Sequence, residues 1–255
     1  MKKARTPSQN KQSSRLWTTA PLILLFAAFF GSVSQLAATD VGHQILKQIE
    51  PHMPEDIKSI LPFRPPEPVA AFLIHGSKAP EEPKSEDGGI IVFVRHVGCP
   101  FAEKSLLDVQ NAARRHPKVQ FTVVTHASPE VFIHHGTWWS NAGQITRGWV
   151  KAISGDDKGL DNLKFESDEE RRLWARWGIQ DHRLYELLTP TSITELITLG
   201  KEGITNRRTQ SASRYARAAA FAVDHERSIL WSWQGDNVSD VPNLEDAVEA
   251  YKKMK

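Results

Sequence analysis

Two short apolar runs lie on either side of an amphipathic stretch near the middle of the chain. The runs are GGIIVFVRH (88–96) and KVQFTVVTH (118–126), and both are rich in β-branched residues. Continuous apolar runs of this length are typical of strands that are buried on both faces. Between them, apolar residues recur at helical spacing after Pro100, which suits the first turn of a helix. The pattern predicts a strand, a helix over 101–115 and a second strand.

A second helical pattern follows an irregular middle region. Pro129 opens one helical turn, and SDEERRLWARWGI (167–179) predicts a longer helix. Ser167 is the expected N-cap of that helix, because Glu170 stands three residues later and would complete a capping box. Trp174 and Trp177 then share one face of the helix, and we expect them to pack in the core.

The C-terminal part of the chain predicts a hairpin and a closing helix. AAFAVDHERSILWSWQG (219–235) is typical of two antiparallel strands with a turn at 225–227, and VPNLEDAVEAYKKM (241–254) is amphipathic. Strands that alternate with helices indicate a parallel sheet, and the hairpin adds antiparallel strands to it. We therefore expect an α/β fold with a central mixed sheet flanked by helices.

The N-terminal region is expected to lie outside this fold. Residues 1–16 are basic, and 17–38 are mostly apolar, with an apolar run of about a dozen residues where a membrane span needs roughly 20. Two interpretations stay open: a single-pass signal anchor, or a signal peptide cleaved near Ala37 and Ala38. Both predict that the C-terminal domain is lumenal or extracellular, either attached to the membrane through 17–38 or secreted.

Residues 39–87 are expected to form a proline-rich linker. Proline fixes φ and removes backbone donors, so such a stretch favours extended, semi-rigid chain. VAAFLIHG (69–76) interrupts it and predicts an edge strand or a docking segment. We place the start of the compact domain, 88–255, near Gly88. Within it, Asn237 begins the sequon Asn-Val-Ser, a candidate glycosylation site if this domain is lumenal.

Composition excludes several classes of function. The net charge is +2, so there is no global basic field and no nucleic-acid partner is expected. The chain has one cysteine, Cys99, which excludes an internal disulfide and a zinc site of several cysteines. No glycine-rich phosphate loop or serine–histidine–aspartate signature is present, and no cofactor is expected. His126, His134 and His135 lie close in sequence, but without a carboxylate at known spacing they predict no metal site.

Cys99 stands where a strand passes into a helix, within RHVGCPFAEKS. The N-terminus of a helix carries partial positive charge, which stabilises a thiolate and makes a cysteine nucleophilic. Arg95 and His96 are close enough in sequence to add positive charge. A thiolate here would attack a peroxide to give a sulfenic acid, or a disulfide to give a mixed disulfide. The alternative is a cysteine that serves only as a small buried apolar residue.

Three stretches carry a family resemblance. They are VFVRHVGCPFAEK (92–104), FESDEERRLWARWGI (165–179) and RAAAFAVDHERSILWSWQGDNVSDVPNLEDAV (217–248). Together they resemble the peroxiredoxin-like antioxidant enzymes (AhpC/TSA) of the thioredoxin-like superfamily. The resemblance implies a thioredoxin-like fold and an oxidoreductase in which Cys99 is the sole nucleophile, regenerated by an external thiol or a redox partner protein. It also implies an arginine that faces the thiolate, for which Arg217 is the better candidate and Arg214 the other.

The sequence departs from the related families at three places. Ala102 stands where thioredoxins have a second cysteine, and no proline precedes the strand that begins near Ala218. Residues 95–98 also lack the proline-to-threonine approach of peroxiredoxins, so a hydroxyl to orient a peroxide would come from elsewhere, with Thr125 as the candidate. Two other functions stay open: an accessory protein of a specialised-metabolite biosynthetic pathway, and a degenerate, non-catalytic binding domain at a membrane. A homodimer is possible in each case.

Overall fold

The computed structural model describes most of the predicted domain and part of the linker. The described residues are Thr39, Gln44, Ile45, Gln48, 67–83, 88–96, 98–126, 160–187, 189–205 and 213–253.

Five strands form one mixed sheet in the order β3-β2-β1-β4-β5. Their bounds are β1 (Gly89–Phe93), β2 (Phe121–Thr125), β3 (Leu163–Ser167), β4 (Ala219–Val223) and β5 (Ile229–Gln234). The first three strands are parallel to one another, whereas β4 pairs antiparallel with both β1 and β5. The predicted mixed sheet and the hairpin are therefore confirmed.

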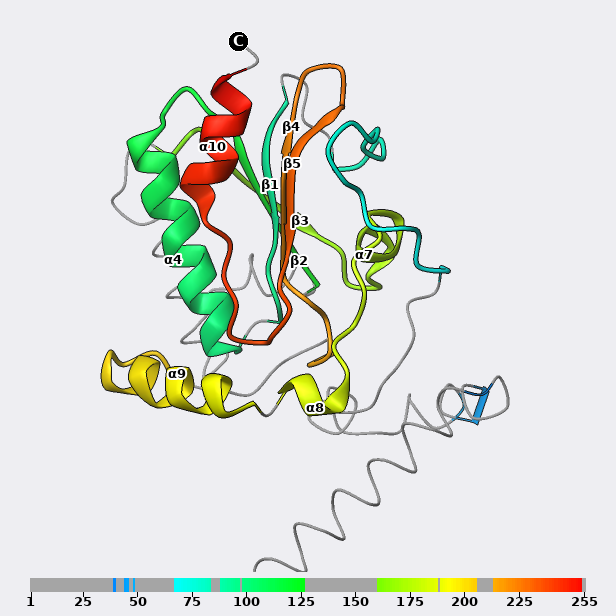
Figure 1. The fold of residues 1–255 in the computed structure, drawn as a ribbon, viewed down its shortest axis with the longest axis vertical. Helices are drawn as coiled ribbons and strands as arrows, with labels where there is room; N and C mark the ends of the chain where they lie inside the picture. Colours follow the sequence, from blue (N-terminus) through cyan, green and yellow to red (C-terminus); the bar gives the residue numbers. More distant parts are fainter. Residues whose placement is uncertain are drawn as a thin grey trace, which may run out of the picture.

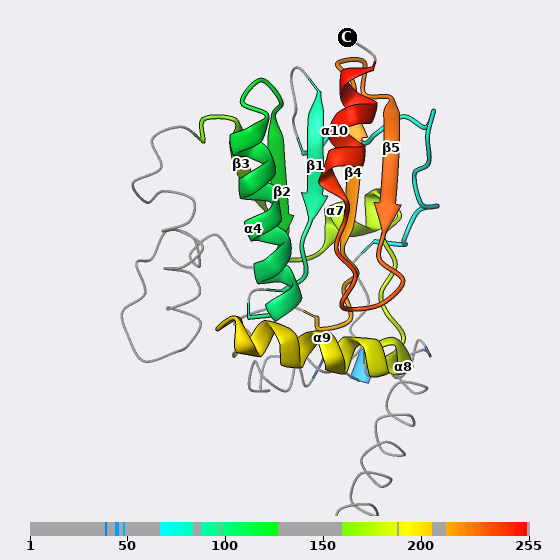
Figure 2. The same ribbon diagram turned by 60° about the vertical axis from the view of Figure 1, so that its left-hand side comes forward.

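Helices cover both faces of the sheet and one of its ends. The bounds are α4 (Pro100–Arg115), α7 (Arg172–Arg176), α8 (Leu184–Leu187), α9 (Pro190–Lys201) and α10 (Leu244–Lys252). Seen edge-on, the sheet has α4 and α10 on one face, and α7 with residues 67–83 on the other (Figure 1). The short α8 and the longer α9 lie across the end toward which β1 runs (Figure 2).

The alternation of side chains along β1 explains why this strand is apolar throughout. Ile90 and Val92 belong to the core beneath α4 and α10, whereas Ile91 and Phe93 belong to the core beneath α7. A strand covered on both faces needs apolar residues at every position. Trp174 and Trp177 fill the second core beside Phe93, so the prediction that they pack inside is confirmed.

The predicted helix at 167–179 begins later than expected. Ser167 ends the parallel strand β3, which the helical pattern obscured, and so it is not an N-cap. The cap comes instead from Asp168, whose Oδ1 accepts from the Arg172 N–H at 2.8 Å and whose Oδ2 accepts from the Trp174 N–H at 3.1 Å. The backbone needs Arg171 in the left-handed region, with φ of 59°, to pass from the strand into α7.

Helix α9 was not predicted, although its start carries a recognisable signal. Thr189 is the N-cap, Pro190 occupies the first turn, and the hydroxyl of Ser192 completes a capping box. Serine replaces the usual Glu or Gln at the third position, which is why the pattern is easily missed.

The described part of the predicted linker packs against the domain. The Ala70 N–H donates to the Ala175 carbonyl at 2.9 Å, and Phe72 lies against Phe221 with ring centroids 5.4 Å apart. Further along, the Gly76 N–H donates to the Ile229 carbonyl at 2.8 Å. VAAFLIHG therefore docks on α7 and on the edge of β5, and it does not form a strand of the sheet.

The order of strands and the placement of helices are those of a thioredoxin-like fold, as the sequence predicted. The C-terminal helix was also predicted correctly, as was the position of the hairpin turn, where Arg227 has a φ of 64°. None of the described helices is long and apolar enough to cross a bilayer. The predicted anchor or signal peptide, 17–38, lies outside the described residues.

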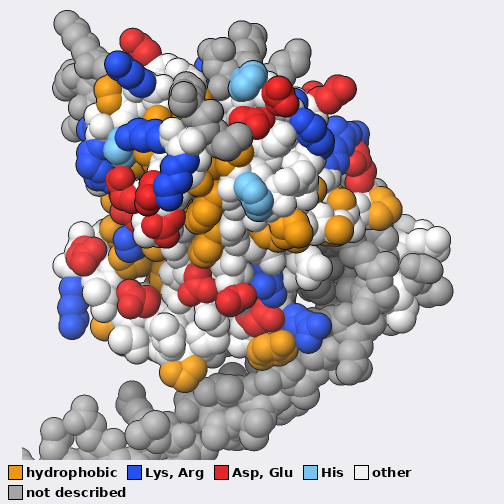
Figure 3. Space-filling model, turned by 45° about the horizontal axis from the view of Figure 1, so that its top comes forward, with side chains coloured by type: hydrophobic (Ala, Val, Ile, Leu, Met, Phe, Trp, Pro, Cys, Tyr) orange, Lys and Arg blue, Asp and Glu red, His pale blue; other side chains and the backbone are white. Residues whose placement is uncertain are grey.

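Charges of both signs are interspersed on the surface. Figure 3 shows Lys and Arg side chains lying beside Asp and Glu side chains on one face of the molecule. Exposed pairs such as Lys253–Glu249, at 2.8 Å, are screened by water and contribute little to stability. The fold is therefore held mainly by the two apolar cores.

Replacing Gly178 by Ala should release the docked segment from α7. Gly178 has a φ of +71°, and an added Cβ would lie 2.2 Å from the Ala71 carbonyl oxygen. Strain and overlap together should lower the free energy of unfolding by about 2–4 kcal/mol in urea denaturation. The control is Gly200→Ala in α9, where a Cβ meets nothing within 4 Å; we expect a gain of about 0.5–1 kcal/mol there. Equal effects of the two substitutions would contradict this account.

Candidate functional site

Cys99 is the last residue before α4, at the end of the sheet toward which β1 runs. Its N–H donates to the His96 carbonyl at 3.1 Å, and its carbonyl accepts from the Glu103 N–H at 3.0 Å, so a tight turn leads directly into the helix. The residue is only 3% exposed and adjoins the core beneath α4. The first turn of the helix places its partial positive charge at the sulfur.

Arg95 is buried beside Cys99 and contacts it directly. The Nη1 group donates to Sγ at 3.2 Å and also lies 3.5 Å from the Val238 carbonyl. The Nε group donates to the Ala216 carbonyl at 3.1 Å, and Nη2 donates to the Arg214 carbonyl. Three carbonyls from two distant segments therefore hold the guanidinium against the sulfur.

The partners of this guanidinium leave its positive charge uncompensated when the thiol is neutral. Carbonyl oxygens satisfy its N–H groups but carry no net charge, and within the described residues no carboxylate pairs with Arg95. A buried charge is costly unless an opposite charge lies close to it. The side chain that this guanidinium contacts most closely through Nη1 is that of Cys99.

Arg217, the expected partner of the thiolate, makes its hydrogen bonds elsewhere. Its Nη2 donates to Glu186 Oε2 at 2.6 Å, its Nη1 to the Gly235 carbonyl at 3.2 Å, and its Nε to the Asp181 carbonyl at 3.4 Å. All three nitrogen atoms are thus used away from Cys99. The other candidate, Arg214, is brought to the site through its backbone carbonyl.

His96 and Thr125 are both buried near the ends of β1 and β2. The backbone of His96 takes part in the turn that leads to Cys99, and its side chain lies close enough to His126 to act on that residue's charge. Burial lowers the pKa of His126 well below its usual value, and the charges of Arg171, His96 and Arg95 act in the same direction. The Thr125 hydroxyl is buried without a hydrogen-bond partner among the described residues.

Sequence reasoning missed a second buried polar group, His182 with Glu186. The His182 Nδ1 atom lies 3.2 Å from Glu186 Oε2, and its side chain is fully buried. Burial and the positive charges of Arg95 and Arg217 lower the pKa of His182 to about 4. Burial acts to raise the pKa of Glu186, but hydrogen bonds from Arg183 N–H and His182, with the charge of Arg217, hold it below its usual value.

The two residues share the spacing i, i+4, which places side chains on one face of a helical turn. That spacing was the available signal in the sequence. It was weak because α8 has only four residues, Leu184–Leu187, and their pattern indicates no amphipathic helix.

Other candidate residues have different surroundings. Asn237 is partly buried in the loop after β5, where its N–H donates to Asp240 Oδ2 at 2.8 Å; the next carbonyl, of Val238, is the one that Arg95 approaches. Within the described part of the chain, no cluster of three or more His, Cys, Asp or Glu side chains is placed to hold a metal ion. His134 and His135 lie outside the described residues.

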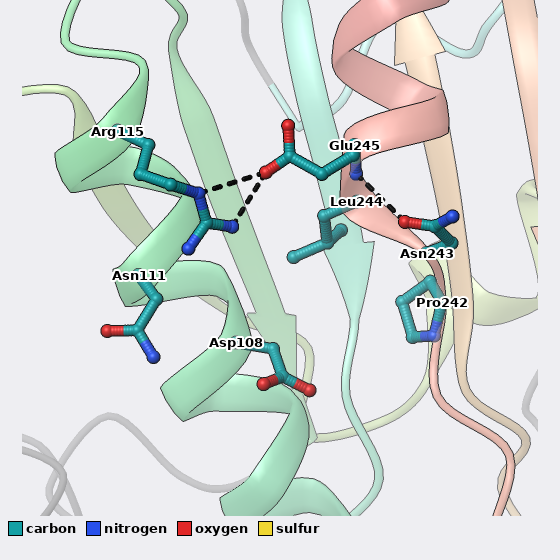
Figure 4. Close-up of a pocket in the computed structure, with 7 residues that line it drawn as sticks. All are labelled: Asp108, Asn111, Arg115, Pro242, Asn243, Leu244 and Glu245. Atoms are coloured by element: carbon teal, nitrogen blue, oxygen red, sulfur yellow. Dashed lines mark hydrogen bonds and ion pairs between the residues drawn. The ribbon is translucent and has the colours of Figure 1, made fainter.

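A polar cleft lies at the opposite end of α4 from Cys99 (Figure 4). It has a volume of about 200 Å³ and lies between α4 and α10. Its lining residues are Asp108, Asn111, Arg115, Pro242, Asn243, Leu244 and Glu245. Arg115 points across the cleft and donates to Glu245 at 2.6 Å, so its charge is already paired. Cys99 is not among the residues that line this cleft, so the cleft does not belong to the Cys99 site.

Comparisons with known proteins give matches among solved structures. No family model and no curated protein sequence matches the chain. Among solved structures, its neighbours are peroxiredoxins and related proteins. A thiol peroxidase from Chromobacterium violaceum is 15% identical, with 73% of this chain and 90% of that chain covered and a TM-score of 0.43. A peroxiredoxin-like protein from Aquifex aeolicus is 16% identical, with 73% and 91% covered and a TM-score of 0.45.

A third neighbour is a variant of peroxiredoxin 6 from Arenicola marina. It is 13% identical, with 71% of this chain and 73% of that chain covered and a TM-score of 0.46. At these identities the likeness concerns the fold alone.

Acidification should weaken the fold through His182. Its pKa in the folded chain is about 4 and that of an unfolded histidine is about 6.5, so the unfolded chain binds the extra proton between these values. The stability that comes from keeping His182 neutral is fully present above about pH 6.5. As the pH falls toward 4, the free energy of unfolding decreases by up to roughly 3 kcal/mol through this residue. Urea unfolding at pH 7 and pH 4.5 should show a smaller difference for His182→Gln than for the wild type. The exposed His225→Gln is the control, and the same pH dependence in all three proteins would contradict the prediction.

Proposed function

We propose that this protein is a thiol oxidoreductase in which Cys99 reduces a small peroxide. The observation that carries the proposal is the 3.2 Å contact between Arg95 Nη1 and Cys99 Sγ, made by a buried guanidinium that has no carboxylate partner in the described chain. Such a cation favours the thiolate, which is the nucleophilic form of cysteine. The helix N-terminus acts in the same direction.

The reaction transfers two electrons from sulfur to the peroxide. The thiolate attacks one peroxide oxygen, the S–O bond forms as the O–O bond breaks, and the leaving oxygen departs as hydroxide or alkoxide and takes up a proton from solvent. Cys99 becomes a sulfenic acid. Arg95, fixed before the reaction by carbonyl partners, is placed to stabilise negative charge as it moves from sulfur to oxygen.

Regeneration requires thiols from outside the chain, because Cys99 is the only cysteine. One external thiol condenses with the sulfenic acid to give a mixed disulfide and water, and a second thiol releases Cys99 and leaves as part of a disulfide. The reductant is therefore a small thiol or a redox partner protein.

Burial of the sulfur favours a small oxidant. With 3% of the residue exposed, a hydrogen peroxide molecule needs far less rearrangement to reach Sγ than the disulfide of a folded protein does. Exchange with a protein disulfide is the second chemistry open to a thiolate, and it would require the helix end to open.

The same burial favours one different function. Cys99 adjoins the apolar core, which is the environment of an inert structural cysteine, and a domain of this kind would bind a partner without catalysis. Attachment to a membrane through 17–38 and glycosylation at Asn237 stay predictions for either function, since both depend on the N-terminal segment.

The test is the reaction of the full-length protein with hydrogen peroxide, followed by intact mass and a sulfenic-acid probe. We expect oxidation well above the rate of a free thiol, confined to Cys99 and absent from Cys99→Ser. Arg95→Gln should slow the reaction by roughly a hundredfold, because it removes the donor fixed beside the sulfur.

Arg115→Gln is the matched control, since Arg115 lies at the other end of α4 and pairs with Glu245. Oxidation no faster than that of a free thiol would reject the peroxidase and favour the binding domain. Equal rates in Arg95→Gln and Arg115→Gln would reject the role of Arg95.

A further inference from the structure

We propose that Arg217, Glu186 and His182 form a clamp that positions Arg95 against Cys99. The clamp acts through the backbone of residues 214–216, and its members are positioning residues that do not touch the sulfur. The inference deepens the proposed function, on which its consequence for catalysis rests, but the geometry that it describes can be tested separately.

The backbone of 214–216 accepts hydrogen bonds from Arg95 and from His182. Arg95 donates to the carbonyls of Arg214 and Ala216, whereas the His182 N–H donates to the carbonyl of Tyr215 at 2.6 Å. Residues 214 and 215 lie in a turn in which the Ala216 N–H donates to the Ser213 carbonyl at 3.5 Å. Arg95 and His182 thus bond to different carbonyls of the same turn, and an isolated bridge between Asp181 and Ala216 adds to the contact with His182.

The side chain of Arg217 connects residues 214–216 to two other parts of the domain. This residue follows Ala216 directly, and its guanidinium reaches both the Asp181 carbonyl and the Gly235 carbonyl. Its third bond goes to Glu186 Oε2 at 2.6 Å, in a pair whose side chains are only 13% and 15% exposed. Residues 181–186 and 214–217 are therefore joined by side chain as well as backbone.

One carboxylate oxygen connects the members of the clamp. Glu186 Oε2 accepts from Arg217 Nη2, from the Arg183 N–H at 3.0 Å, and lies 3.2 Å from His182 Nδ1. Removing its charge leaves Arg217 buried without a counter-charge and His182 without a charged partner. Buried polar networks of this kind lose more than one bond when a central member is removed.

The consequence at Cys99 follows from the bonds of Arg95. Two of its carbonyl partners lie on the clamped segment, so a shift of 214–216 moves the guanidinium relative to the sulfur. Small displacements of a group that contacts reacting atoms have large effects on rate.

The experiment compares Glu186→Gln with Glu245→Gln in the full-length protein. Glu245 is a matched control, because it also accepts from an arginine and a histidine, Arg115 and His116, but at the opposite end of α4. The first readout is the hydrogen-exchange rate of the Arg95 Nε–H group by NMR, with its signal assigned by Arg95→Lys. The second is the rate of Cys99 oxidation by hydrogen peroxide.

Glu186→Gln should accelerate Arg95 Nε–H exchange and slow Cys99 oxidation, each by roughly tenfold to a hundredfold, while Glu245→Gln changes neither. Unchanged Arg95 exchange in folded Glu186→Gln would overturn the clamp, whatever the oxidation rate. If the wild type itself is oxidised no faster than a free thiol, the proposed function fails. The exchange measurement still tests whether the clamp restrains Arg95.

A second variant keeps the test valid if Glu186→Gln does not fold. The double substitution Glu186→Gln/Arg217→Gln removes both charges of this ion pair, so neither of the two residues is left buried with an unpaired charge. It should still accelerate Arg95 Nε–H exchange. A double variant with wild-type exchange would overturn the proposal.

Discussion

The contact between the Arg95 guanidinium and the Cys99 sulfur governs the rest of the site. A guanidinium this deeply buried is tolerated only where its donors are satisfied and its charge is compensated. Carbonyls of Arg214, Ala216 and Val238 satisfy the donors, and in the proposed function the thiolate of Cys99 is the counter-charge. The proposal thus joins a requirement of folding to one of thiol chemistry.

The two apolar cores make this arrangement rigid. The strand β1 contributes alternate residues to each core, and Arg95 lies two residues beyond its end, so both cores anchor the backbone that leads to the guanidinium. Residues 214–216, which carry two of the carbonyls bonded to Arg95, lie in a turn outside the sheet. Arg217, which follows this turn, is held by the Asp181 carbonyl and by the carboxylate of Glu186.

Local patterns allowed much of the scaffold to be predicted. Apolar runs indicated β1 and β2, the hairpin followed from its alternation and turn, and Pro100 marked the start of α4. The predictions failed where a local sequence pattern was compatible with more than one secondary structure, or where a capping pattern was unusual. Ser167 fits a helix cap, but tertiary pairing with β2 makes it the last residue of β3, and Asp168 becomes the cap. Thr189, Pro190 and Ser192 begin a helix whose capping box uses serine, so α9 escaped notice.

The sequence by itself determined that any redox chemistry here uses one cysteine, that this cysteine stands between a strand and a helix, and that Arg95 is near it. Two residues that are four positions apart, such as Arg95 and Cys99, stay near each other in any fold, because the short chain between them limits their separation. Only the tertiary structure decided between Arg95 and Arg217 as the neighbour of Cys99, since both arginines flank buried strands. It also brought Glu186 to Arg217, across about 30 residues, through an ion pair that no spacing in the chain encodes.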